Sequence, residues 1–130
     1  MKKGTLLIFS MSLVMVLLTA CGGQEKEVKS VFGDLIDSIN KKDAQLYISS
    51  FHEDSMMLEL VDVEFMQEQF DQSDDVRISI KSVEIAELTE EEAILDYVIE
   101  VREDSQVNEE TGSFLLLNTD QGWKIIDEMY

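Results

Sequence analysis

The sequence is short of residues that stabilise or catalyse through special chemistry: it has no proline, one cysteine and one histidine among 130 residues. A single cysteine cannot form a disulfide within the chain, so the hydrophobic core must stabilise the fold even in an oxidising compartment. One histidine and one cysteine are also too few ligands for an ordinary zinc or iron site. We therefore expect neither a metal nor any other cofactor.

Basic residues are scarce: 10 Lys and Arg stand against 28 Asp and Glu, a formal charge of −18. This balance argues against nucleic acid or an anionic lipid surface as partner, because phosphate contacts require a basic surface. The acidic run of Asp71, Asp74 and Asp75 suggests calcium. However, an EF-hand loop from Asp71 needs glycine and glutamate where Val76 and Ser82 stand, so the loop pattern fails.

The amino terminus has the layout of an export signal: Lys2 and Lys3, an apolar run over 6–18, and then Ala20 before Cys21. A membrane-spanning helix needs about 20 apolar residues. The stretch from 6 to 20 is shorter than that and is interrupted by serines. A buried core cysteine is the other alternative, but a polar segment follows Cys21 at once.

The motif Leu18-Thr19-Ala20-Cys21 resembles the lipobox of bacterial lipoproteins. That resemblance implies cleavage between Ala20 and Cys21 and lipidation of Cys21, with palmitate among the acyl chains. It predicts a signal peptide over 1–20, a flexible tether over 21–27 and one folded domain over 28–130. The Cys-Gly-Gly start and the lack of proline are similar to lipoproteins of Gram-positive bacteria, which implies an anchor on the extracytoplasmic face of the cell membrane.

Hydrophobic spacing predicts helices in the first part of the domain. From residue 28 to 39 apolar residues recur every three or four positions, the stripe of an amphipathic helix. Asp43 is a suitable N-cap for a second helix that turns Leu46, Tyr47 and Phe51 inward. The apolar stretch 56–61 is expected to be a buried strand or a loop, and Asp62 to cap a further short helix.

From residue 76 the spacing changes to the alternation of strands. The alternation slips near Lys81-Ser82, which indicates a bulge. Expected beyond it are a turn at 89–91, a strand over 93–101, a polar loop over 103–110, a strand over 112–118, a turn at 120–122 and a strand over 123–127. Helices followed by a four-stranded antiparallel sheet make an α+β fold, with the helices packed on a curved sheet.

The segment Phe51-His52-Glu53-Asp54-Ser55 and the hairpin Asp120-Gln121-Gly122-Trp123-Lys124-Ile125 resemble the NTF2-like (cystatin-like cone) superfamily. The resemblance implies a cone with a pocket between helices and concave sheet. Some members are isomerases, dehydratases or cyclases, and many others are binding or assembly modules. The fold alone therefore does not decide between catalysis and binding. Members often pair through the outer sheet face, which makes a homodimer one assembly the resemblance allows.

Few residues qualify for catalysis. His52 could act as a base oriented by Glu53 or Asp54, or simply be a half-exposed residue at a helix end. Asp96 and Glu100 could be pocket carboxylates but fit a solvated strand face better. The expected pocket or partner surface is built around the methionine-rich middle segment, since loops on rigid scaffolds commonly carry function. Its residues are Phe51, His52, Met56, Met57, Met66 and Tyr97.

Two functional hypotheses follow. The first is a non-enzymatic lipoprotein, held to the membrane through lipid on Cys21, that binds a protein partner or a small apolar ligand. The alternative is a small NTF2-like hydrolase or isomerase that uses His52 with a nearby carboxylate. No catalytic residue is assigned. A structural envelope component cannot be separated from the first hypothesis by sequence.

Overall fold

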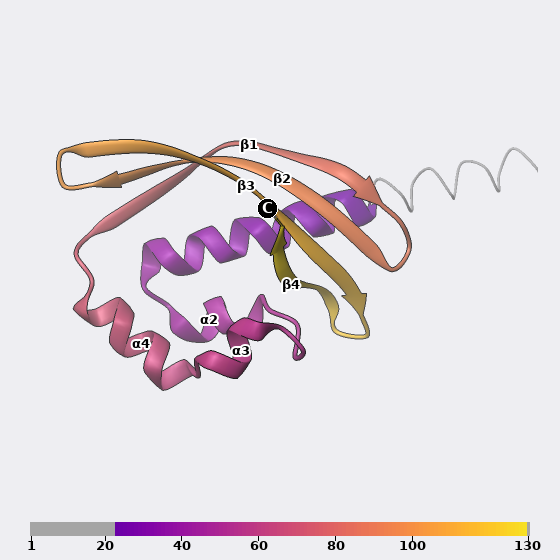
Figure 1. Cartoon of the computed structure of the whole chain (residues 1–130), viewed down its shortest axis with the longest axis horizontal. Helices are drawn as coiled ribbons and strands as arrows, with labels where there is room; N and C mark the ends of the chain where they lie inside the picture. Colours follow the sequence, from indigo (N-terminus) through magenta and orange to yellow (C-terminus); the bar gives the residue numbers. More distant parts are fainter. Residues whose placement is uncertain (1–22, 130) are drawn as a thin grey trace, which may run out of the picture.

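The computed structural model describes residues 23–129, which form helices packed under a curved, four-stranded antiparallel sheet (Figure 1). A helix over 23–41, drawn in indigo and violet, crosses beneath the sheet. The shorter helices that follow it are α2 (Ala44–Ser49), α3 (Met56–Leu60) and α4 (Val63–Gln72). The sheet has the order β1-β2-β3-β4, with β1 Val76–Leu88, β2 Glu92–Glu103, β3 Gln106–Thr119 and β4 Gly122–Met129.

The core lies between the long helix and the concave face of the sheet. Phe32 of the helix is 1% exposed, and Leu95 and Leu116 of the central strands are 0% and 1% exposed. The predicted stripe is confirmed over most of its length, while Val31 at its edge is only partly buried. The buried apolar cluster consists of Val28, Phe32, Leu35, Ile36, Ala93, Leu95, Ile99, Leu116, Trp123 and Ile125.

The long helix includes residues 23–27, which we expected to be a flexible tether. Their polar composition suits an exposed first turn, since Gln, Glu and Lys are good helix formers. Lys29 forms an ion pair with Glu25 one turn earlier, at 3.2 Å. Val28 is fully buried and fixes this end of the helix against the sheet. Residues 21 and 22 lie outside the described part of the chain.

Two predicted helix starts are confirmed, and one prediction was wrong. The Oδ1 atoms of Asp43 and Asp62 accept hydrogen bonds from backbone N–H groups of α2 and α4, at 3.1 and 2.8 Å. The stretch 56–61 is mainly the short helix α3 rather than a buried strand or loop. Ser55 caps α3, and Met56 and Leu60 are 70% and 76% exposed. The apolar composition of this stretch suggested burial in the core, whereas Met56 and Leu60 lie at a hollow on the surface.

The sheet follows the predicted order with one correction. The register shift between Ile80 and Ser82 confirms the bulge. The expected polar loop over 103–110 is instead a tight turn, with Asp104 at φ 53°, followed at once by β3. Residues 102–111 are exposed and form a hairpin arm that reaches past the helices. Because its residues are exposed, such an arm needs no apolar face.

The last hairpin closes the cone. Gly122 adopts φ 101°, which completes the predicted turn after Thr119. The end of α2 then joins the free edge of β4: the Ile125 N–H donates to Ser50 O at 2.9 Å, and the His52 N–H donates to Ile125 O at 2.7 Å. This short parallel bridge ties the helical layer to the sheet.

Candidate functional site

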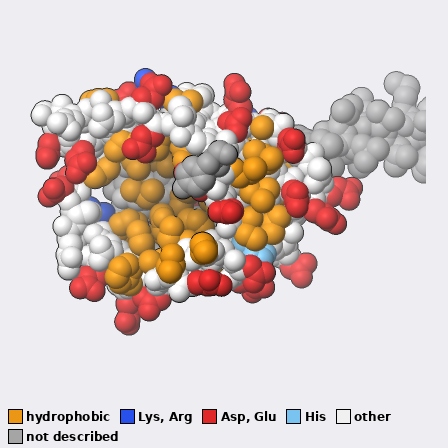
Figure 2. Space-filling model, viewed as in Figure 1, with side chains coloured by type: hydrophobic (Ala, Val, Ile, Leu, Met, Phe, Trp, Pro, Cys, Tyr) orange, Lys and Arg blue, Asp and Glu red, His pale blue; other side chains and the backbone are white. Residues whose placement is uncertain are grey.

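A cavity of about 590 Å³ opens between the long helix, α2, α3 and the concave sheet. We call it the cone cavity. Figure 2 shows its face of the molecule, where apolar side chains gather in a hollow with acidic side chains around it. The residues that line it are Phe32, Leu35, Ile36, Ile39, Tyr47, Phe51, Ser55, Met56, Met57, Leu60, Ile78, Tyr97, Ile99, Val101, Glu110, Phe114, Ile125, Ile126, Asp127 and Glu128.

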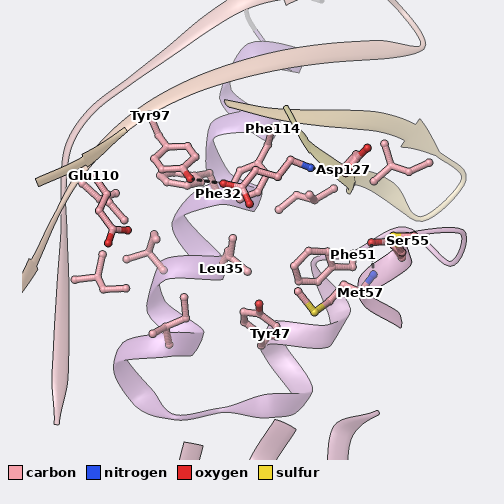
Figure 3. A pocket seen from close by; sticks show the side chains of 18 of the residues that line it. Phe32, Leu35, Tyr47, Phe51, Ser55, Met57, Tyr97, Glu110, Phe114 and Asp127 are labelled. Carbon is pink, nitrogen blue, oxygen red and sulfur yellow. Dashed lines mark hydrogen bonds between the residues drawn. The ribbon is translucent and has the colours of Figure 1, made fainter. Parts of the chain in front are cut away.

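Aromatic rings make up much of the cavity wall (Figure 3). Tyr97 stacks on Phe32 with ring centroids 5.0 Å apart, and on Phe114 at 5.2 Å. On the other side of the cavity Tyr47 and Phe51 are neighbours, with ring centroids 5.2 Å apart. These rings come from the long helix, β2, β3 and the α2 region, so the folded chain is needed to bring them together.

The charged residues that line the cone cavity are all acidic: Glu110, Asp127 and Glu128. Glu110 comes from the hairpin arm of β3 and lies on one side of the cavity, and Asp127 of β4 lies on the other (Figure 3). The Tyr97 hydroxyl donates a hydrogen bond to Glu128 Oε1 at 3.3 Å. No lysine, arginine or histidine is among the described residues that line it.

Both burial and a nearby negative charge affect the pKa of the Tyr47 hydroxyl in the cavity wall. Burial, and to a smaller extent the negative charge of Glu128, raises the pKa of the Tyr47 hydroxyl above its ordinary value of 10.0. The hydroxyl therefore stays protonated through neutral pH and remains able to donate a hydrogen bond. The field of Glu128 thus reaches a partly buried group in the cavity wall.

The structure brings four of the six expected surface residues to this cavity and leaves two outside it. Phe51, Met56, Met57 and Tyr97 line it. Met66 lies half-buried on α4 and is not among the lining residues.

Sequence reasoning missed the acidic members. Glu110 falls in the stretch expected to be a loop, and Glu128 follows the last predicted strand. Glu128 pairs with Phe114 across β3 and β4, a register that the sequence does not reveal.

His52 belongs to a different, smaller hollow. It is lined by Glu53, Leu58, Asp120 and Lys124 among others, outside the cone cavity apart from the shared Phe51. Nδ1 of His52 accepts a hydrogen bond from the Asp54 N–H at 3.0 Å and lies 3.9 Å from Asp54 Oδ2. The ring nitrogen nearest a carboxylate is therefore occupied by the local turn.

The other polar candidates are placed on the outer surface. Asp96 is exposed and accepts a hydrogen bond from Ser113 at 2.5 Å. Glu100 lies 3.6 Å from Lys81 and 3.6 Å from Arg102, as expected for a solvated strand face. Within residues 23–129, no group of His, Cys, Asp and Glu side chains could hold a metal ion.

The expected lipidation and cleavage residues, Cys21 and Ala20, lie outside the described residues. Among the helices that are described, none is long and apolar enough to cross a membrane.

Solved structures of low sequence identity share this fold. A domain of unknown function with a cystatin-like fold from Nostoc punctiforme is 17% identical, with a TM-score of 0.64 over 82% of this chain and 75% of its own. An NTF-2 like protein of unknown function from Shewanella oneidensis is 12% identical, with a TM-score of 0.62 over 80% and 95%. The association domain of CaMKII from C. elegans is 16% identical, with a TM-score of 0.60 over 82% and 94%. The fold is therefore the NTF2-like, cystatin-like cone, as the sequence analysis predicted.

None of the curated proteins matches the chain. The model of one protein family does, and it covers residues 30–130, which is nearly the whole folded domain. On this match the chain belongs to the family described as the C-terminal domain of the anti-sigma-I factor RsgI9.

Proposed function

We propose that this chain is an extracytoplasmic, lipid-anchored binding module whose cone cavity holds a small apolar ligand. The observation that carries the proposal is the cavity itself: about 590 Å³, open to solvent and walled mainly by aliphatic and aromatic side chains. Binding pockets for small molecules typically have this size and this apolar lining. A concave hollow also suits a small ligand better than the flat face of a protein partner.

The family supports binding rather than turnover. An anti-sigma factor is a regulator, and a domain of such a protein fits a role in which ligand occupancy is a signal. The catalytic alternative lacks support from geometry, because His52 is outside the residues that line the cavity and its Nδ1 is held by Asp54.

Ligand binding can be tested with N-phenyl-1-naphthylamine, a neutral apolar dye that fluoresces when it leaves water. The full chain in phosphatidylcholine nanodiscs should raise its fluorescence saturably, after subtraction of empty nanodiscs. Ile39 lines the cavity, so Ile39→Trp should fill it and weaken binding about tenfold, or 1.4 kcal/mol. Met57→Trp, on α3, is a second cavity-filling change that leaves the core alone.

Val107→Trp is the matched control, because Val107 is 50% exposed on the hairpin arm and does not line the cavity. Binding that is unaffected by both cavity-filling changes, with folding intact by circular dichroism, would overturn the ligand proposal. Equal loss in the Val107→Trp control would mean that the dye reports something other than the cavity.

Anchoring is tested separately in bacterial cells. The full chain should sediment with membranes and incorporate labelled palmitate, and Cys21→Ala should lose both properties. Gly23→Ala is the control, because it keeps the cysteine and an added Cβ at Gly23 meets nothing within 4 Å. Persistent palmitate labelling of the Cys21→Ala form would exclude Cys21 as the lipid site.

A further inference from the structure

We propose that the cone cavity selects organic cations, in particular an ammonium group attached to an apolar or aromatic body. This inference rests on the proposed function, since it takes the cavity as a ligand site, and it adds the chemical class of the ligand. Three features carry it: acidic residues around the cavity, aromatic walls, and the lack of a basic side chain among the described residues that line it.

The acidic residues come from separate parts of the chain. Glu110 is on the β3 arm, and Asp127 and Glu128 are near the end of β4, so the lining places carboxylates on opposite sides of one opening (Figure 3). A cation in the opening is attracted by all three, whereas a neutral ligand gains nothing from them. An anionic ligand is repelled by the same groups, which gives the cavity a sign preference.

Among residues 23–129, no lysine, arginine or histidine forms an ion pair with Glu110, Asp127 or Glu128. Arg102 is on the arm itself and lies 3.6 Å from Glu100. Lys81 Nζ lies 2.9 Å from Glu109 and 3.6 Å from Glu100, on the other face of the sheet from Glu110. Glu128 accepts a hydrogen bond from the neutral Tyr97 hydroxyl, which orients the carboxylate and leaves its charge intact. The influence of Glu128 on Tyr47 indicates that this charge is felt within the cavity.

The aromatic wall suits the same ligand. Phe32, Tyr97 and Phe114 pack as one group, and Tyr47 and Phe51 as another. Aromatic faces carry negative potential and attract quaternary ammonium groups, and aromatic side chains also bury apolar ligand surface well. A ligand with an ammonium head and an apolar body can therefore pack against the aromatic wall and also interact with the acidic residues of the cavity.

The test compares phenyltrimethylammonium with tert-butylbenzene, which has the same shape but carbon in place of the charged nitrogen. Both compete with N-phenyl-1-naphthylamine for the full chain in phosphatidylcholine nanodiscs at low salt. The exposed carboxylates together should make the cation bind about tenfold more tightly than its neutral isostere. Added sodium chloride should reduce that preference, because exposed charges are screened.

Substitutions of single carboxylates show which residues cause the preference for the cation. Glu128→Gln and Glu110→Gln should each lower the affinity for phenyltrimethylammonium about threefold and leave tert-butylbenzene unchanged. Glu87→Gln removes the same charge from an exposed position on β1 outside the cavity lining and should have no effect. Glu110 is on the exposed arm, so Glu110→Gln keeps the test available should Glu128→Gln unfold.

Each outcome has one meaning. Equal affinity for the two isosteres overturns cation selection and leaves the cavity as an apolar ligand site. An equal effect of Glu87→Gln attributes the preference to the overall negative charge and also overturns the inference. Dye binding with no competition by either isostere rejects this ligand class alone, whereas absence of dye binding rejects the proposed function itself.

Discussion

Tyr97 lies directly across the β2–β3 ladder from Gly112, and a side chain at Gly112 would collide with its hydroxyl group and ring. The missing Cβ lets the ring fold flat over β3. In that position the ring stacks on both Phe32 and Phe114, which are also neighbours of each other, and its hydroxyl reaches Glu128 of β4. One glycine therefore sets the aromatic wall and orients an acidic residue of the cone cavity.

Gly112→Ala should destabilise the domain and narrow the cavity. The added methyl group must displace the Tyr97 ring from its stack, which costs about 1–3 kcal/mol, as overpacking of a core does. Urea unfolding measures the loss, and the dye titration should show weaker binding in the same variant. Unchanged stability together with unchanged dye affinity would contradict the role given to Gly112.

Gly33→Ala is the matched control for this substitution. Gly33 lies within the long helix, and a Cβ there meets nothing within 4 Å. Alanine is the better helix former by about 1 kcal/mol. The same chemical change should therefore stabilise the domain at position 33 and destabilise it at position 112.

Asn40→Ala should loosen the connection between the long helix and β1. The Asn40 side chain donates to Ile78 O at 2.8 Å and accepts from Ile78 N at 2.7 Å, so it pairs with the strand edge as another backbone would. Alanine leaves both backbone groups of Ile78 without these partners, at a cost of about 1–3 kcal/mol. Asn108→Ala, on the exposed arm, is the control in urea unfolding and should change stability by less than about 0.5 kcal/mol.

Leu95→Ala tests the position of the core. Leu95 is fully buried between the long helix and the sheet, so its truncation should leave a cavity and cost about 2–5 kcal/mol. Leu60→Ala makes the same chemical change at a side chain that is 76% exposed and should have little effect on the urea midpoint. Similar losses for the two variants would mean that α3 is buried in solution.

The features that could be predicted from sequence are those that depend on the polarity or the capping preference of individual residues. The stripe around Phe32 marks the buried side of the long helix, Asp43 and Asp62 mark helix starts, and the slip after Ile80 marks the bulge. The hairpin arm could not be predicted in this way. Its side chains are exposed on both faces, so 106–111 carries no alternation and reads as a loop.

The candidate site was only partly predictable for a related reason. Aromatic and methionine side chains point to an apolar pocket wherever the fold places them. The roles of Glu110 and Gly112 depend instead on strand register and on the reach of β3 beyond the helices. The lipid site stays a prediction, because Cys21 precedes the described residues.

Tyr47 should give the stability of the domain a characteristic dependence at alkaline pH. Its folded-state pKa is raised above 10.0, chiefly by burial and further by Glu128. Above pH 10 the unfolded chain therefore releases this proton first, and the folded chain holds the extra proton. The contribution to stability is complete below pH 10 and is lost as the pH rises through the folded-state pKa.

The measurement compares urea unfolding of the wild-type chain and Tyr47→Phe from neutral pH to about pH 11. The difference in free energy of unfolding between them should be constant below pH 10 and should change above it in the direction of a weaker wild type. Absorbance of the phenolate at alkaline pH gives the pKa of Tyr47 directly, by difference between the two chains. Glu128→Gln should lower that pKa while leaving it above 10.0, because burial is the larger cause. A Tyr47 that titrates at its ordinary pKa would contradict its place in the cavity wall, and a pKa unmoved by Glu128→Gln would remove the electrostatic link between them.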